Sequence, residues 1–269
     1  MKRAQRGEQE RLTRLAWILA GIAGAVNAGG FMAVQAYTSH VTGSLSRAAD
    51  DLALGRWNPA LAALSVVLAF FLGALTSGSM VAYAQRRRIH GHYAASLALE
   101  AALLTLFGLG GPRLAGSALM GVPDTILLLS FIMGMHNALV TQVSHAVVRT
   151  THMTGIVTDL GLELSRLFYR NRSRDPRLQP VLADRAKLRL HALLLLSFFG
   201  GGLAGALAFN AVSYPAALPL AALMLALSAR PLWRDLPVAM APQQPVAPAY
   251  APPAPPARAT ALVDDDLPF

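Results

Sequence analysis

Six long apolar stretches, separated by shorter polar segments, run through the chain. Each is nearly free of charge and, at roughly 20 residues, is long enough to cross a bilayer as a helix. Helices are expected because the lipid interior leaves every backbone group dependent on partners within its own segment. The stretches cover about residues 15–34, 60–84, 93–109, 124–143, 191–212 and 214–229.

Two shorter amphipathic segments follow the first and fourth stretches. Leu45, Ala49 and Leu52 recur at helical spacing after the first stretch. After the fourth, apolar residues from Ile156 to Phe168 mark one face of a second helix. Segments of this kind are typical of short helices that lie at the membrane interface.

Glycine and proline predict where ordered structure ends. Gly110-Gly111-Pro112 is expected to break the third helix. The last part of the chain, residues 233–269, is rich in proline and ends near three consecutive aspartates. Such a composition cannot build a core, so this tail is predicted to be disordered and dispensable for folding in the membrane.

A polar pattern occurs twice along the chain. Gly24–Ala28 leads to Ser39–Gly43, and about 110 residues later Gly134–Ala138 leads to Thr151–Gly155. Both copies read G-x-x-N-A, followed by a hydroxyl residue and H-x-T-G. The chain therefore reads as two related halves of three spans each, residues 15–115 and 116–232.

The charge distribution predicts the orientation of these spans. The chain is 54% hydrophobic and only 14% charged, against about 25% charged residues in ordinary globular domains. Of its 23 Lys and Arg residues, 20 lie in residues 1–14, in the segments 85–92 and 144–190, and near the carboxyl terminus. The positive-inside rule then places both termini in the cytoplasm. Because three spans per half reverse the direction of the second half, the predicted fold is an all-α, polytopic membrane protein of six helices arranged as a 3+3 inverted repeat.

Several function classes find no support in the sequence. The absence of cysteine excludes disulfides, thiol catalysis and cysteine-bound metal. His136, His145 and His152 are nine and seven residues apart, which matches no standard metal-ligand spacing. No nucleophile-elbow motif and no nucleic-acid-binding module is visible. We therefore expect no enzymatic activity, no cofactor, no metal and no nucleic-acid partner.

At the repeated motifs the chain resembles the YoaK-type family of bacterial multi-pass membrane proteins, a domain of unknown function. The resemblance covers about residues 12–232 and rests on the two motifs together with Arg149 and Asp159. Members of that family often carry Asn after the first H-x-T-G, where this chain has Ser44. The resemblance implies a six-helix protein of the bacterial inner membrane and no settled activity.

The motif residues are the candidates for binding a solute. A carboxamide in hydrocarbon needs partners, glycine permits a bend, and a helix that begins at the bend attracts anions. The alternative is structural: the asparagines join helices, and Thr42 and Thr154 act as N-caps. The candidate substrate-binding residues are Asn27, His40, Thr42, Gly43, Asn137, Thr151, His152, Thr154 and Gly155.

Two acids are candidates for proton coupling. Glu100 lies seven residues beyond Tyr93, roughly 10 Å into the third span, where acids are costly and often carry protons. The alternative is a paired or snorkelling side chain beside the basic loop. Asp159 follows the second motif and is expected to form an ion pair with Arg149.

These features predict a small secondary transporter or permease for a small polar solute, with anions among the candidates. The two motifs are expected to line one shared cavity near the midplane. The alternatives are a channel, or a membrane scaffold or sensor that does not transport. The expected partners are the lipid bilayer and the solute, and the sequence leaves homo-oligomerisation open.

Overall fold

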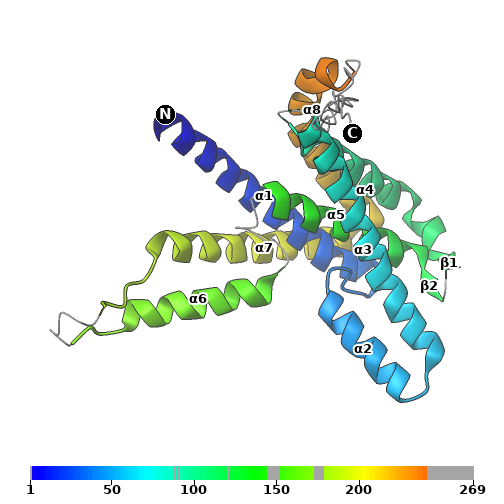
Figure 1. The fold of residues 1–269 in the computed structure, drawn as a ribbon. Coiled ribbons are helices and arrows are strands. Elements are labelled where there is room, and N and C mark those ends of the chain that lie inside the picture. The colour runs from blue at the N-terminus through cyan, green and yellow to red at the C-terminus, as the bar shows by residue number, and fades with distance from the viewer. Residues whose placement is uncertain are drawn as a thin grey trace, which may run out of the picture. The chain divides into compact units, whose positions relative to one another are not determined.

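The computed structural model describes residues 2–87, 89, 91–119, 121–143, 152–172 and 179–240. The described residues form eight α-helices, one 3-10 helix and one short hairpin (Figure 1). Except for Met240, they belong to one compact unit, Met1–Ala239. In chain order the elements are α1 (Lys2–Val34), α2 (Val41–Ala53), α3 (Trp57–Arg86), α4 (Ala94–Ala115), β1 (Ala118–Leu119), β2 (Val122–Pro123), α5 (Asp124–Val143), α6 (Met153–Phe168), α7 (Arg185–Val212), η1 (Tyr214–Ala216) and α8 (Ala217–Met240).

Six of these helical segments are long and apolar enough to cross a membrane: α1, α3, α4, α5, α7 and η1–α8. The amphipathic helices α2 and α6 follow the first and fourth spans, which confirms the predicted all-α fold with six candidate spans. The arrangement of the two halves as an inverted repeat stays a prediction. Six successive crossings place the start of α1 and the end of α8 on one side, here called the terminal side. The hairpin β1–β2 joins α4 to α5 on the opposite side, here called the hairpin side.

The predicted break at Gly110-Gly111-Pro112 is wrong, because α4 continues through all three residues to Ala115. Proline removes one backbone hydrogen bond, but packing by neighbouring helices makes this tolerable in a membrane. Here Gly111 lies directly against the ring of Tyr214, and Gly108 one turn earlier lies against Leu218. Contacts with η1 and α8 thus stabilise α4 where glycine and proline would otherwise end the helix.

The last helix is longer than predicted and is anchored at its end. α8 extends to Met240, past the expected boundary at residue 232. Asp235 is 5% exposed and its Oδ2 accepts a hydrogen bond of 2.5 Å from the backbone N–H of Gly91, in the connection between α3 and α4. The final turns of α8 are therefore part of the helical bundle, whereas residues 241–269 of the predicted tail lie outside the described residues.

Two helix pairs, α1 with α7 and α3 with α5, pack most closely. A Cβ atom at Gly24 on α1 would overlap the carbonyl oxygen of Phe198 on α7. A Cβ atom at Gly134 on α5 would overlap the carbonyl oxygen of Phe70 on α3 in the same way. Small residues permit such backbone contact between membrane helices. The glycine that opens each G-x-x-N-A motif is thus a helix-packing residue, and the two copies serve equivalent interfaces.

A buried carboxylate ties each amphipathic helix to the start of the following span. Asp51 near the end of α2 pairs with Arg56, its Oδ1 lying 2.7 Å from Nη2, just before α3. Glu163 near the end of α6 accepts a hydrogen bond of 2.8 Å from the backbone N–H of Asp184, just before α7. Both acids are nearly inaccessible to solvent. Each half therefore uses a buried carboxylate at this place, bound to a guanidinium group in the first half and to a backbone N–H in the second.

Candidate functional site

The centre of the bundle holds one buried acid–base pair, Glu100 on α4 and His136 on α5. The two residues are 0% and 2% exposed, and Glu100 Oε2 lies 2.9 Å from His136 Nδ1. On its other side, His136 Nε2 lies 3.0 Å from the backbone carbonyl oxygen of Leu19 on α1. Three spans from different parts of the chain therefore meet at one imidazole ring.

The carbonyl of Leu19 fixes the hydrogen-bonding state of the ring. A carbonyl oxygen only accepts, so Nε2 of His136 carries a hydrogen and donates it to Leu19. One further proton is then shared between Nδ1 and the Glu100 carboxylate. Whether it resides on the ring or on the carboxyl group, the pair carries no net charge, which suits a site closed to water.

Glu100 retains an unused acceptor. Its Oε1 is buried and has no hydrogen-bond partner among the described residues. A buried oxygen without a partner carries the cost of its lost hydration, in the range of about 1–3 kcal/mol. The pair therefore has one open position, at which a water molecule or a polar ligand group would be stabilised.

Polar groups lead from the pair toward the terminal side of α4. One turn from Glu100, Ser96 shares a hydrogen bond of 2.8 Å with Ser77 on α3. Tyr93 follows at the end of the helix, where partial burial and then the nearby carboxylate of Asp235 raise the pKa of the phenol. Hydroxyl groups and a carboxylate therefore line this end of α4 in steps of about one helical turn.

Apolar groups close the opposite direction. Phe107 lies seven residues beyond Glu100, or roughly 10 Å along the helix, and its side chain is fully buried. Its ring lies 5.3 Å from the ring of Tyr214 and 6.4 Å from that of Phe209, measured between centroids. Leu104 is buried between Phe107 and the pair. In this arrangement the pair is sealed by hydrophobic packing toward the hairpin side.

The first repeated motif forms a local turn after α1. Asn27 Oδ1 accepts hydrogen bonds from the hydroxyl and the backbone N–H of Ser39, at 2.8 and 3.4 Å. His40 is the N-cap residue of α2, and its exposed ring lies against Gly43. The predicted capping role of Thr42 is wrong, since Thr42 lies inside the first turn of α2. Asn27 therefore fastens the connection between α1 and α2.

The second motif repeats this arrangement where it is described. His152 is the N-cap residue of α6, its exposed ring lies against Gly155, and Thr154 again lies inside the first turn. The glycine of H-x-T-G is explained in both copies, because a Cβ atom there would meet the imidazole ring. Asn137 donates a hydrogen bond of 2.7 Å to the carbonyl oxygen of Met133. Thr151, predicted to bind the solute, lies outside the described residues.

The two sets of motif residues lie apart in this structure. The order of the spans puts His40 on the hairpin side and His152 on the terminal side. Neither of the two described cavities is lined by any of the candidate substrate-binding residues. The shared cavity therefore stays a prediction.

Asp159, the second candidate for proton coupling, connects α6 to α7 near the terminal side. Its Oδ2 lies 3.4 Å from Lys187 Nζ and 3.7 Å from Nδ1 of the buried His191, and its side chain is 39% exposed. The expected partner Arg149 lies outside the described residues. Asp159 thus belongs to a different cluster from Glu100.

His136 is the residue whose role was not recognised from the sequence. It precedes Asn137 in G-M-H-N-A, whereas the first motif has Val26 at that place. This departure from the repeat, an imidazole in an apolar span while a neighbouring span holds Glu100, is the signal that could have identified the pair. In the described part of the chain no group of three potential metal ligands occurs.

Comparisons with known proteins place the chain in a family. No curated protein and no solved structure is similar enough to this chain to count as a match. The family described as "Protein of unknown function (DUF1275)" matches residues 15–229, which include all six spans up to the middle of α8. This agrees with the resemblance to YoaK-type proteins. The chain therefore belongs to the DUF1275 family of membrane proteins.

Proposed function

We propose that this protein is a small secondary transporter of the bacterial inner membrane that moves a small polar solute together with protons. In this proposal Glu100 and His136 carry the proton. The observation that supports it is the fully buried, neutral pair held between three spans. Ionisable side chains are costly within a membrane, and those that occur there commonly belong to substrate or proton pathways.

The chemistry of the pair suits alternating exchange of a proton. While the pair is dry, loss of the shared proton would leave a buried negative charge, which is strongly unfavourable. Once water reaches Oε1 of Glu100, that charge is solvated and the proton can leave. The pair therefore holds its proton when closed and exchanges it when opened, as a proton-coupled carrier requires.

The residues around the Glu100–His136 pair differ between its two sides, and this difference favours proton exchange from the terminal side. Ser96, Ser77 and Tyr93 provide hydroxyl groups toward the terminal side, whereas Leu104 and Phe107 block the hairpin side. We propose that the terminal side is cytoplasmic, as the basic residues indicate. The proton would then exchange with the cytoplasm in this conformation, and opening of the apolar block would expose the pair to the other side.

We further propose that the two halves form an inverted repeat. Four observations support this: the repeated motifs, their equivalent glycine contacts, the matching α1–α7 and α3–α5 packing, and the paired carboxylate connections of α2 and α6. Inverted repeats are common in secondary transporters, in which one repeat moves against the other. The candidate solute-binding residues of the two motifs would lie on the connections that such a movement displaces.

Flux measurements in liposomes test this function. Purified protein is reconstituted with a pH-sensitive dye inside, and amino acids, dicarboxylates, sugars and inorganic phosphate are added in turn. At least one class should drive proton movement, and Glu100→Gln should abolish it. Asp159→Asn is the matched control, because it also neutralises a paired acid but should leave coupling intact.

Uptake of a radiolabelled solute, measured in the same liposomes beside the dye signal, separates the alternatives. A channel would pass solute down its own gradient without proton movement, and Glu100→Gln would not change this flux. A scaffold or sensor would give no flux with any solute. Loss of coupling in Asp159→Asn with retention in Glu100→Gln would contradict the assignment of the proton site.

A further inference from the structure

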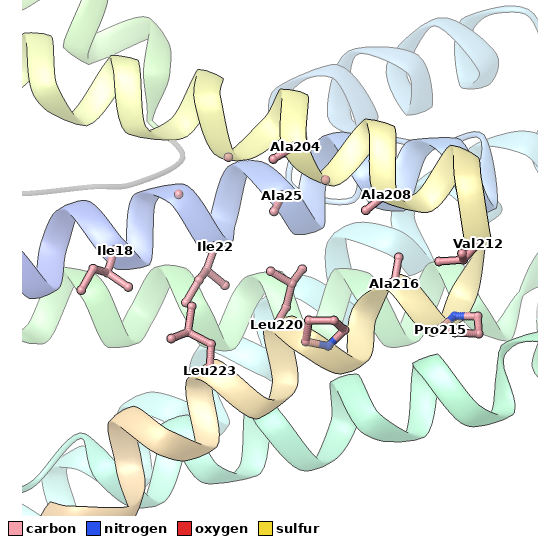
Figure 2. Close-up of a pocket in the computed structure, with 14 residues that line it drawn as sticks. Ile18, Ile22, Ala25, Ala204, Ala208, Val212, Pro215, Ala216, Leu220 and Leu223 are labelled. Carbon is pink, nitrogen blue, oxygen red and sulfur yellow. The ribbon is translucent and has the colours of Figure 1, made fainter.

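A second, chemically different site lies between α1, α7 and α8. A cavity of about 470 Å³ opens there, and its lining side chains contain only carbon (Figure 2). Ile18 and Ile22 on α1 face Leu220 and Leu223 on α8, with alanines of α7 along one side. Because all three helices contain candidate membrane spans, the cavity lies at the depth of the lipid chains.

The cavity lies where the packing of the two halves differs. α4 lies along α5, to which it is joined by the β1–β2 hairpin. α8 occupies the corresponding place in the second half, yet among the described residues it makes no comparable packing with α1. Instead, Leu218 and Tyr214 hold the start of α8 and η1 against α4. Ile18 and Leu223 consequently remain 41% and 42% exposed.

The volume limits what can fill the cavity. One turn of an α-helix, about 10 Å across and 5.4 Å long, occupies roughly 420 Å³. A cavity of about 470 Å³ thus holds little more than one turn, so a slender hydrocarbon chain fits it better than a whole transmembrane helix. A small-molecule ligand or a single hydrocarbon chain fits, since such sites have volumes of about 300–1,000 Å³.

Both walls of the cavity lead to an exposed arginine on the terminal side. Arg14 precedes Ile18 by four residues and therefore lies on the same face of α1. Arg230 follows Leu223 by seven residues and lies on the same face of α8. We propose that this cavity binds one acyl chain of an anionic lipid, with the head group at the level of these two arginines. Arginine near a membrane surface attracts anionic head groups, which gives the site its charge preference.

Lipid retention measured by native mass spectrometry tests the proposal. The full-length protein is extracted from vesicles of equal parts phosphatidylglycerol and phosphatidylcholine, and the lipid that remains bound is identified. One phosphatidylglycerol should remain on the wild type. Ala208→Phe, which fills the cavity, should reduce its occupancy at least tenfold. Ala102→Phe is the matched control, because Ala102 is also exposed within a span but does not line the cavity.

Two further measurements keep the test decisive if Ala208→Phe does not fold. A phosphatidylglycerol with a photoreactive acyl chain should label wild-type peptides that contain Ile18 or Leu223 in preference to the outer face of α3. The double variant Arg14→Gln/Arg230→Gln should lose the preference for phosphatidylglycerol over phosphatidylcholine. Absence of bound lipid, equal retention in both alanine variants, or labelling that is uniform over all spans would overturn the proposal.

Discussion

Removing His136 alone should be one of the most damaging single changes in this protein. His136→Leu leaves the carboxyl group of Glu100 at the centre of the bundle with neither of its oxygens hydrogen-bonded by a described residue. Deleting one partner of a buried ion pair costs about 3–5 kcal/mol. Here the remaining carboxyl group either stays charged without water or a partner, or takes up a proton that it does not hold in the unfolded chain near neutral pH. We expect a loss of unfolding free energy in that range.

The converse change should cost less. Glu100→Leu leaves a neutral imidazole, which keeps its hydrogen bond to the Leu19 carbonyl and loses one partner. A neutral buried group without a partner costs about 1–3 kcal/mol. The double variant should recover most of the loss, because an apolar pair can replace a buried ion pair without net cost. The order of stability is therefore wild type and double variant, then Glu100→Leu, then His136→Leu.

Reversible unfolding in mixed detergent micelles measures this order. The chain contains three tryptophans, so fluorescence and circular dichroism can follow the same transition. The proton pair as described would be refuted by His136→Leu within about 1 kcal/mol of wild type, or by a double variant as unstable as the sum of both single changes. The double variant should also show no solute-driven proton movement, which separates its stability from its function.

Three further predictions concern packing and topology. Gly201→Ala should lower the melting temperature, since its Cβ would overlap the backbone of α1, whereas Gly200→Ala, with open space around it, should not. Asp235→Ala should cost about 1–3 kcal/mol in unfolding free energy, because it leaves a buried backbone N–H without its acceptor. Of single cysteines at Ser117 and Ser173, introduced into this cysteine-free chain, only the one at Ser117 should react with an impermeant reagent in intact cells, and the one at Ser173 should react only after the cells are opened. Equal labelling of both cysteines in intact cells would contradict the six-span topology.

The spans could be predicted because hydropathy is a local and additive property. Twenty apolar residues favour a membrane helix wherever they occur, and the spacing of Leu45, Ala49 and Leu52 already indicates the apolar face of α2. The prediction that the helix ends after Leu109 was wrong because the end of this helix depends on tertiary contacts. Gly111 and Pro112 weaken α4, but their effect is outweighed by Tyr214, which lies more than 100 residues away along the chain.

Only part of the candidate site could be predicted from the sequence, because the rest again depends on tertiary contacts. Glu100 is conspicuous in the sequence because an acid in hydrocarbon is costly whatever surrounds it. The partner of Glu100 depends on which helix packs against α4 at that level. Hydrophobic periodicity alone does not predict which spans pack together. The repeated motifs drew attention to Asn27 and His40, whose contacts in the structure are with their own connecting segment. The repeated motifs thus indicate structural features that the two halves share. His136, which has no counterpart in the first motif, is the residue that pairs with Glu100.

Two contacts, one of η1 with α4 and one of α8 with the connection before α4, bear on how the buried pair would become accessible from the hairpin side in the proposed transport cycle. Near the hairpin side, the ring of Tyr214 covers Gly111 and contacts Phe107, and near the terminal side Asp235 binds Gly91. We expect the first contact to open while the second holds. Water would then pass Phe107 and reach Glu100.

A disulfide between positions 111 and 214 tests this movement. Cγ of Tyr214 lies directly against the position that a Cβ atom of residue 111 would take, and the Cβ atom of Tyr214 is one bond away from it, so cysteines at both positions lie within reach of a disulfide. The chain has no other cysteine to interfere. Oxidation of Gly111→Cys/Tyr214→Cys should stop solute-driven proton movement, and reduction should restore it to the level of the unoxidised variant. If the oxidised protein transports as fast as the same protein after reduction, the contact between η1 and α4 does not control access to the pair. The route to Glu100 must then open elsewhere.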